Sequence, residues 1–280
     1  MNWPTFRHEA MATFFEITIA DQAEDYARQA AVAAWRELDR LEGELSRYVE
    51  SSDIARANRL ARGATIAIGD DALECLLLAA ELALVTHRAF DAGYASERAA
   101  DASADSPLFT LDPGAHTLTS HAARLHLDLG AIGKGYALDR LARVLGDWGI
   151  SSAGLNSGGS TVLALAPPAG ELGWSVGLGE GATHRTVPLA HAALSGSGIA
   201  VKGAHLIDPR TGNPAIRAGR AWALAPTATL ADALSTAFFV WDDEGVAAFC
   251  AVEPEVGAAL ATSHSLLSFH GKLREFCTQD

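Results

Sequence analysis

Residues 126–139 read HLDLGAIGKGYALD, a short apolar alternation that runs into three glycines and then into a helical pattern. The alternation predicts a strand over residues 125–129, and Gly130, Gly133 and Gly135 predict a tight turn after it. Beyond the turn, apolar residues recur at helical spacing at positions 137, 141, 144, 145 and 148. A strand followed at once by a helix is typical of a domain that mixes both kinds of element.

The glycine turn is open to two interpretations. Backbone N–H groups at the start of a helix can hold a phosphate group, and the helix dipole favours an anion there. The turn also fits a structural role, in which Asp128 caps and Lys134 stays in solvent. Two familiar phosphate motifs are excluded, because a GxxxxGK[ST] loop needs Gly at Asp128 and Ser or Thr at Gly135, and no GxGxxG occurs.

The pattern on either side of this stretch predicts the fold class. Before it come an alternating strand over residues 14–19, a long amphipathic helix over 23–45 and a second helix over 73–84. After it, short strands at 161–166, 174–178, 204–207 and 221–225 precede a helix over 230–240. Because helices gather early and strands late, we expect an α+β protein with a mixed or antiparallel sheet core and flanking helices.

The chain length bounds the number of domains. At about 150 residues per domain, 280 residues make one large domain or two small ones. No linker-like segment divides the chain, so we expect an N-terminal extension at residues 1–10 and a single domain over 11–280.

Composition and charge exclude several classes of protein. The net charge of −13 repels phosphate backbones and anionic lipid, so nucleic acid is not an expected partner. No run of about 18 apolar residues occurs, so membrane insertion is not expected. The start has no secretory signal pattern, and the three cysteines form no CxxC pair. These features favour a reduced, cytoplasmic protein.

Residues 227–236 read TATLADALST and offer a candidate metal site. Asp232 and Thr236 are four residues apart, so they share one face of a helix. A carboxylate and a hydroxyl are hard oxygen ligands of the kind that Mg²⁺ takes together with water and substrate phosphates. The same segment also fits a capping box in which Thr229 pairs with Asp232, and the spacing leaves both interpretations open.

Residues 205–214 read HLIDPRTGNP and combine a turn with a candidate base. Asp-Pro-x-x-Gly is a turn signal, because Pro fixes its own φ and Asp bonds the backbone that follows. His205 stands just before this turn. It fits either a structural histidine or a general base that works at neutral pH.

Two further segments carry weaker signals. The serines in NSGG at 156–159 and SGSG at 195–198 lack the GxSxG frame of a hydrolase, so the glycines fit better a backbone that approaches a bulky ligand. Ala89-Phe90-Asp91 follows the second predicted helix and fits an aromatic core residue beside an exposed acid.

Taken in order along the chain, these segments resemble the motifs of the ApbE family, the magnesium-dependent FAD:protein FMN transferases. MAT at 11–13 is similar to the family's Met-Gly-Thr, and SRY at 46–48 with SDIARAN at 52–58 to its Ser-x-Tyr and Ser-Glu-Leu-x-x-x-Asn. AFD at 89–91 and the stretch 128–139 resemble its Gly-x-Phe-Asp and Asp-Leu-Gly-Gly-Ile-Ala-Lys-Gly-Tyr-Ala-x-Asp. NSGG at 156–159, HLIDPRTG at 205–212 and ADALST at 231–236 complete the set.

The resemblance implies a role for individual residues. The Ala131 carbonyl, Asp232 and Thr236 would bind Mg²⁺, and His205 would act beside the FAD diphosphate. The residues that would line the FAD site are Met11, Tyr48, Ala89, Phe90, Asp91, Asp128, Lys134 and Ile207. Two departures stand out: Asp91 is followed by Ala-Gly-Tyr instead of Pro-Thr-x-Gly-Pro, and Ser160 stands where the family has Asp.

The resemblance also implies a reaction. A Thr or Ser hydroxyl of an acceptor protein would attack the FMN-side phosphorus of FAD, AMP would leave, and FMN would stay attached through a phosphoester. The same residues would equally serve an FAD diphosphatase, in which water replaces the hydroxyl, and a non-catalytic flavin-binding protein is a third alternative. The chain has no Asp-x-x-Ser/Thr-Gly-Ala-Ser/Thr segment of the kind the family modifies, so self-modification is not expected.

Overall fold

The computed structural model describes residues 3–103, 106–179, 183–198, 207–215, 219–261 and 267–276. Within these ranges the largest element is an eight-stranded sheet in which every neighbouring pair is antiparallel. Its strands, in spatial order, are β1 (Thr5–Ala10), β2 (Thr13–Ile19), β6 (Ala153–Ser157), β7 (Thr161–Ala164), β10 (Ala192–Gly198), β11 (Arg220–Ala225), β12 (Gly257–Ala261) and β13 (Leu267–Gly271). The expected α+β class with an antiparallel core is confirmed.

The first two strands show why this part of the sequence forms a sheet. In β2, alternate residues Phe15, Ile17 and Ile19 are fully buried, which is the period of two that a half-buried strand requires. Residues 5–10, which belong to the N-terminal extension expected over residues 1–10, form β1 and pair with β2 along their whole length. The two strands are joined by a two-residue turn.

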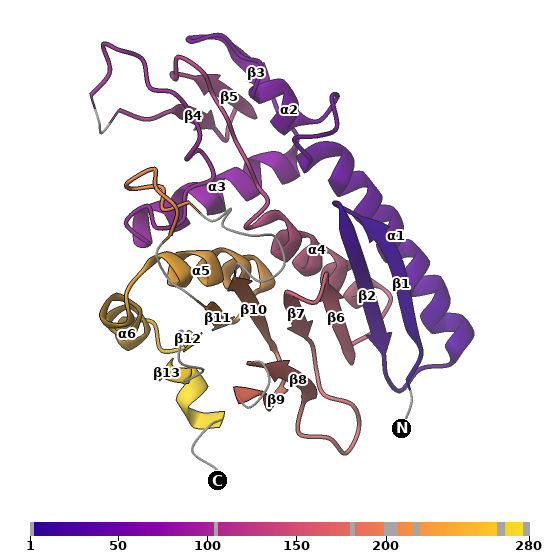
Figure 1. Ribbon diagram of the computed structural model, residues 1–280. Helices are drawn as coiled ribbons and strands as arrows, with labels where there is room; N and C mark the ends of the chain where they lie inside the picture. The colour runs from indigo at the N-terminus through magenta and orange to yellow at the C-terminus, as the bar shows by residue number, and fades with distance from the viewer. Residues whose placement is uncertain are drawn as a thin grey trace.

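Helices cover one face of the sheet (Figure 1). α5 (Ala228–Val240) lies against β10 and β11, α4 (Gly133–Asp147) packs beside α5, and α1 (Glu24–Leu45) packs against α4 and β1. The buried positions of α1 recur at helical spacing, so its apolar stripe faces this core. α3 (Asp70–Val85) lies beyond α1 and α5.

A two-stranded ribbon packs on the opposite face of the sheet. β8 (Trp174–Leu178) and β9 (Arg185–Leu189) form a buried cluster with Leu194, Trp222 and Leu224 of the main sheet. A third sheet, in the order β3 (Thr65–Ala67), β5 (Thr117–Ser120) and β4 (Phe109–Asp112), stands beside α2 (Asp53–Ala57) at the top of Figure 1. Near the C-terminus, α6 (Asp243–Val252) and the 3₁₀ helix η2 (Lys272–Phe276) pack against β12 and β13.

The predicted strand over residues 125–129 is wrong. The backbone of Leu127 is held by a side chain instead of by a strand, because Asn58 accepts from its N–H at 2.6 Å and donates to its carbonyl at 2.9 Å. The N–H of Asp128 donates to the carbonyl of Ala92 at 2.8 Å. Satisfied in this way, the segment runs straight into α4 without a sheet partner. Of the predicted strand 204–207, only Ile207 lies within the described residues, and it forms an isolated bridge with Pro214.

Candidate functional site

The start of α4 meets the first turns of α5, and Asp232 lies at this junction. Its side chain is only 6% exposed, and its carboxylate accepts a hydrogen bond from the backbone N–H of Gly135 at 3.1 Å. The ammonium of Lys134 lies 3.2 Å and 3.4 Å from its two oxygens. A backbone donor at a helix start and a cation therefore compensate the charge that burial would otherwise disfavour.

The capping-box interpretation of Asp232 is wrong. The N-cap of α5 is Thr227, whose hydroxyl accepts from the N–H of Leu230. Thr229 instead donates, through both its N–H and its hydroxyl, to Asp139 of α4, which also accepts from the N–H of Ala228. The first turn of α5 is thus satisfied by another helix. Burial raises the pKa of Asp139 despite these three donors.

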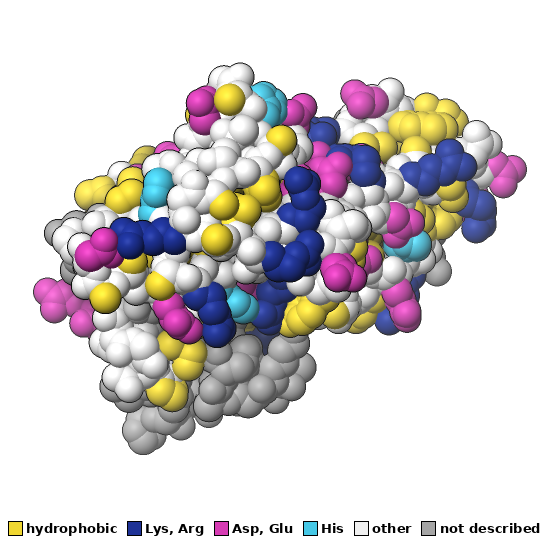
Figure 2. Space-filling view, turned by 90° about the horizontal axis from the view of Figure 1, so that it is seen from above, with side chains coloured by type: hydrophobic (Ala, Val, Ile, Leu, Met, Phe, Trp, Pro, Cys, Tyr) yellow, Lys and Arg dark blue, Asp and Glu magenta, His cyan; other side chains and the backbone are white. Residues whose placement is uncertain are grey.

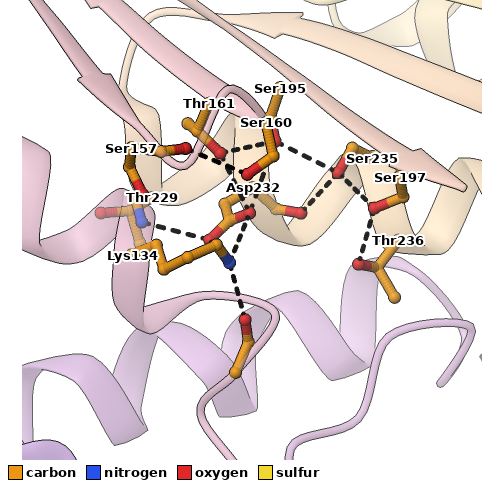
Figure 3. Close-up of polar contacts among 12 residues, drawn as sticks. Lys134, Ser157, Ser160, Thr161, Ser195, Ser197, Thr229, Asp232, Ser235 and Thr236 are labelled. Carbon is orange, nitrogen blue, oxygen red and sulfur yellow. Dashed lines mark hydrogen bonds and ion pairs between the residues drawn. The ribbon is translucent and has the colours of Figure 1, made fainter. Parts of the chain in front are cut away.

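Two buried hydroxyls from the sheet reach the same carboxylate. Thr161 of β7 donates to Asp232 Oδ1 over 3.3 Å, and Ser195 of β10 approaches the same oxygen at 3.4 Å. The two hydroxyl oxygens are 2.9 Å apart. Asp232 is therefore fixed from the helix side by Lys134 and from the sheet side by hydroxyls (Figure 3).

The hydroxyls continue along α5 toward Thr236. Ser235 donates to the carbonyl of Asp232 at 2.8 Å and lies 2.8 Å from the hydroxyl of Ser197. Ser197, on β10, lies 3.2 Å from the hydroxyl of Thr236. Figure 3 shows this chain leading away from the buried carboxylate. Ser197 and Thr236 are partly exposed, so the chain ends where solvent or a ligand has access.

The donors at this junction fit a magnesium ion. The carboxylate of Asp232 and the hydroxyl of Thr236 face the same side of α5, and both are hard oxygen ligands. Among the described residues, no hydrogen bond reaches the carbonyl of Ala131, because the N–H of Gly135 that would bond it in a longer helix goes to Asp232. A backbone carbonyl left without a donor is the third oxygen that the resemblance implies.

Asp128 and Lys134, the two residues with an expected structural role in the glycine turn, both form hydrogen bonds and ion pairs. Asp128 Oδ1 accepts from the N–H of Gly130 at 2.9 Å, and Oδ2 lies 3.4 Å from the guanidinium of Arg47. The expected cap is wrong, because the N-cap of α4 is Ile132 and no side chain in the described part of the chain caps this helix. Lys134 is not free in solvent, because it donates to the carbonyl of Gly130 at 2.8 Å as well as pairing with Asp232. The turn is thus closed by its own side chains.

Met11 and Tyr48 are both contacted by charged side chains. Met11 forms the β1–β2 turn together with Ala12, and its N–H donates to Glu42 of α1 at 2.7 Å. Tyr48 is 76% exposed, yet Arg47 holds it in place by donating to its hydroxyl at 2.5 Å and lying 4.5 Å from its ring centroid. An exposed aromatic ring fixed in this way is a ready stacking surface.

Ala89, Phe90 and Asp91 form a tight turn after α3. Ala89 and Phe90 are buried in the core, as the structural interpretation of this segment had it, and neither presents its side chain to solvent. Asp91 is not the exposed acid that this interpretation paired with them: it accepts from the N–H of Gly93 at 2.8 Å and pairs with Arg88 at 3.4 Å.

The segment around His205 is described only in part. His205 lies outside the described residues, and Ile207 is partly exposed. The predicted Asp-Pro-x-x-Gly turn is confirmed, because the N–H groups of Thr211 and Gly212 both donate to the carbonyl of Asp208. A hydrogen bond from Arg210 holds the pKa of Asp208 below its ordinary value.

The glycines at 158 and 196 accommodate side chains of this protein instead of a bulky ligand. A Cβ on Gly158, which has a φ of 58°, would lie 2.4 Å from the hydroxyl of Thr13. A Cβ on Gly196 would lie 2.8 Å from the indole nitrogen of Trp222. Both glycines therefore serve packing, Gly158 in the turn between β6 and β7 and Gly196 within β10.

The sequence does not indicate that several of these side chains meet, although the SGSG segment at 195–198 stood out for its glycines. Thr161, Ser195 and Ser197 come from different parts of the chain and meet Asp232 and Thr236 only because β7 and β10 pair in the sheet. Arg47 lies within the SRY segment, but nothing in that segment indicates that its guanidinium bridges Tyr48 and Asp128.

The surface near the third sheet differs from what the net charge suggests. Seen from that side, Lys and Arg side chains gather near the centre of the face, beside scattered acidic ones (Figure 2).

No helix among the described residues has the length and apolar character needed to cross a bilayer.

Comparison with known proteins gives consistent matches. The model of the ApbE family matches residues 11–260. A protein of Klebsiella pneumoniae (strain 342) named FAD:protein FMN transferase is 24% identical over 275 residues, covering 84% of this chain and 78% of that protein. A protein of the same name from Treponema pallidum (strain Nichols) is 31% identical over 165 residues, covering 51% of this chain and 45% of that protein.

Solved structures share the fold. The flavin transferase ApbE from Vibrio cholerae superposes with a TM-score of 0.80 at 20% identity, over 98% of this chain and all of that one. The ApbE protein from Thermotoga maritima gives a TM-score of 0.81 at 22% identity, over 98% of this chain and 99% of that one. Because the family model spans most of the sequence and the fold agrees throughout, the chain belongs to the ApbE family.

Proposed function

We propose that this protein is an FAD:protein FMN transferase, which uses Mg²⁺ to transfer FMN from FAD to a Thr or Ser hydroxyl of an acceptor protein. Membership of the ApbE family and the names of the curated relatives support flavin transfer. The observation that carries the proposal furthest is the junction of α4 and α5, where the buried carboxylate of Asp232 pairs with Lys134 and the hydroxyl of Thr236 lies one turn further along α5. The carbonyl of Ala131, just before α4, accepts no hydrogen bond from the part of the chain that the structure describes. We propose residues 11–280 as the catalytic domain.

Each site residue has a proposed part. Ala131, Asp232 and Thr236 hold the metal through a carbonyl, a carboxylate and a hydroxyl oxygen. The residues that line FAD are Met11, Tyr48, Ala89, Phe90, Asp91, Asp128, Lys134 and Ile207. Of these, Tyr48 contributes an exposed ring.

The proposed reaction is a phosphoryl transfer. The acceptor hydroxyl oxygen attacks the phosphorus on the FMN side, the bond from that phosphorus to the AMP oxygen breaks, and AMP leaves. His205 takes the hydroxyl proton, a role typically worth about 10²–10⁴-fold in rate. A bound magnesium ion would neutralise charge on the diphosphate and on the leaving phosphate.

The residues around the metal ligands support binding of an anion. Lys134 supplies a cation next to Asp232, and the start of α4 supplies the positive end of a helix dipole. Together they offset the charge of Asp232, which would otherwise repel a diphosphate.

A single incubation tests the proposal. The purified protein is mixed with FAD and Mg²⁺, with and without a peptide that carries an Asp-x-x-Thr-Gly-Ala-Thr segment, and AMP and peptide mass are followed. AMP together with a peptide that has gained phosphoester-linked FMN supports the transferase. AMP with free FMN in both tubes indicates a diphosphatase, and intact FAD in both contradicts catalysis on this acceptor.

Two variants test the proposed roles separately. His205→Ala should keep FAD binding and lose transfer, and unchanged transfer would remove His205 from the mechanism. Asp232→Asn should shift the Mg²⁺ titration of the reaction to higher concentration. Asp147→Asn, at an exposed position at the end of α4, is the matched control and should leave the titration unchanged.

A further inference from the structure

The hydroxyl groups between Asp232 and Thr236 form a hydrogen-bonded chain in which each group donates in a defined direction. This direction orients Thr236, a ligand of the proposed metal site, and the inference rests on that proposed site. The chain runs from the carbonyl of Asp232 through Ser235 and Ser197 to Thr236, with oxygen–acceptor distances of 2.8, 2.8 and 3.2 Å (Figure 3). Each hydroxyl has one proton to donate and lone pairs to accept. Fixing one proton therefore fixes those that follow.

The direction starts at the carbonyl. A carbonyl oxygen only accepts, so Ser235 donates its single proton to Asp232. Ser235 then has only lone pairs to offer Ser197, so Ser197 donates to Ser235. The proton of Ser197 is now used, and the contact between Ser197 and Thr236 requires Thr236 to donate.

The orientation of Thr236 follows. With its proton directed at Ser197 on the sheet side, the lone pairs of the Thr236 hydroxyl are left for another partner. A helical threonine often donates to the carbonyl one turn earlier, but that carbonyl accepts the Ser235 hydroxyl here. The geometry points to Ser197 as a positioning residue. It accepts a hydrogen bond from the Thr236 hydroxyl and thereby directs the lone pairs of the Thr236 oxygen toward a divalent cation.

The consequence is a measurable contribution to metal affinity from a residue that does not itself bind the metal. Removing the acceptor at Ser197 frees the Thr236 hydroxyl to rotate, so its lone pairs are no longer fixed. Outer partners of metal ligands typically change affinity or activity by about 10–100-fold when they are removed. We expect the lower part of that range, about tenfold, because Asp232 keeps its own bonds to Lys134, Gly135 and Thr161.

The experiment measures Mn²⁺ binding to the full-length protein without FAD, from the electron paramagnetic resonance signal of free Mn²⁺. Ser197→Ala should raise the Kd about tenfold, and Ser197→Thr, which keeps a hydroxyl, should restore affinity to within about threefold of the parent. Ser175→Ala, an exposed strand serine on β8, is the matched control and should not change the Kd. Circular dichroism checks that each variant is folded.

The same substitution made in a Thr236→Ala variant separates a positioning role of Ser197 from a general disturbance of the site. If Ser197 acts through Thr236, Ser197→Ala should add less than about twofold to the Kd of a Thr236→Ala variant, because coupled residues are not additive. A parent that binds Mn²⁺ with the same Kd as Ser197→Ala overturns the role of Ser197 and leaves the metal site intact. A parent that binds no Mn²⁺ overturns the metal site itself, and Ser197→Thr without recovery also contradicts the proposal.

Discussion

Gly135 of α4 lies against Ala228 of α5 so closely that a Cβ on Gly135 would stand 2.1 Å from the Ala228 carbonyl oxygen. Real Cβ atoms do not approach backbone oxygen to that distance, so no other residue fits without moving a helix. The contact brings the starts of both helices together, next to Lys134 on one and Asp232 on the other. The third glycine of the turn is therefore a packing requirement of the site.

Gly135→Ala should both destabilise the protein and separate the site residues. The clash is with backbone, which cannot rotate away, so we expect a loss of about 3 kcal/mol in the free energy of unfolding, at the upper end for overpacking. Urea denaturation measures this loss. Because α5 must shift, Mn²⁺ affinity should fall in the variant that remains folded.

Gly146→Ala is the matched control within the same helix. A Cβ at Gly146 meets nothing within 4 Å, and the residue lies in the last turns of α4. Alanine is favoured over glycine in a helix by about 1 kcal/mol, so this variant should be slightly more stable than the parent. Equal effects from both substitutions would show that steric contact with Ala228 is not the cause.

Ala12→Gly should stabilise the protein. Met11 and Ala12 have φ values of 53° and 57° and close a two-residue turn between paired Ala10 and Thr13. An L-residue in this left-handed region costs about 1–2 kcal/mol, and glycine avoids most of that cost while losing more chain entropy on folding. We expect a net gain of about 0.5–1 kcal/mol in thermal or urea unfolding.

Ala33→Gly is the control and should lower the free energy of unfolding, where Ala12→Gly should raise it. Ala33 lies in the middle of α1, where its backbone is helical and glycine loses about 1 kcal/mol relative to alanine. If Ala12→Gly also destabilises, backbone strain in the turn is not significant.

Arg47→Gln should weaken FAD binding without unfolding the protein. The substitution removes the cation over the Tyr48 ring and the donor to its hydroxyl, so the exposed ring gains freedom that FAD must then restrict. We expect the Kd for FAD to rise about five- to tenfold, measured by quenching of flavin fluorescence. Arg59→Gln is the control, because the side chain of Arg59 bonds only the carbonyl of Glu50 among the described residues. Equal Kd values for the two variants would contradict the role of Arg47.

Asp71 should cause the free energy of unfolding to fall as the pH is lowered. It is 5% exposed, and although burial raises its pKa, hydrogen bonds from Tyr136 and Arg40 outweigh burial and leave the pKa below the ordinary value. The folded form therefore binds fewer protons than the unfolded chain, so the stability from Asp71 is present above the unfolded pKa of about 3.9 and is lost as pH falls through the folded pKa.

Asp71→Asn tests this dependence. The variant should be less stable at pH 7, because Arg40 and Arg140 lose a buried partner, and its free energy of unfolding should change less between pH 5 and pH 3 than that of the parent. Urea denaturation at each pH measures both. An identical pH profile in parent and variant would assign the acid sensitivity to other carboxyls.

The sequence by itself determined the local features whose causes are local. The alternation in β2, the apolar stripe of α1, the Asp208 turn and the placing of Asp232 and Thr236 on one face of α5 all depend on residues within one segment. Together with the ordered motifs, they were sufficient to predict the α+β class and the ApbE family. They also left two open alternatives, which were a capping role for Asp232 and a free Lys134.

Only the tertiary structure excluded a capping role for Asp232 and a solvated Lys134, because the partners that exclude them are distant in the chain. Asp232 is bonded by residues 97 and 71 positions away, Gly135 and Thr161, and the first turn of α5 is satisfied by Asp139. The predicted strand at 125–129 failed for the same reason, since the side chain of Asn58, 69 residues away, takes the place of a neighbouring strand. Alternation within a segment shows which side chains are buried, but the hydrogen-bond partners of a buried polar group are fixed by the elements that pack beside it.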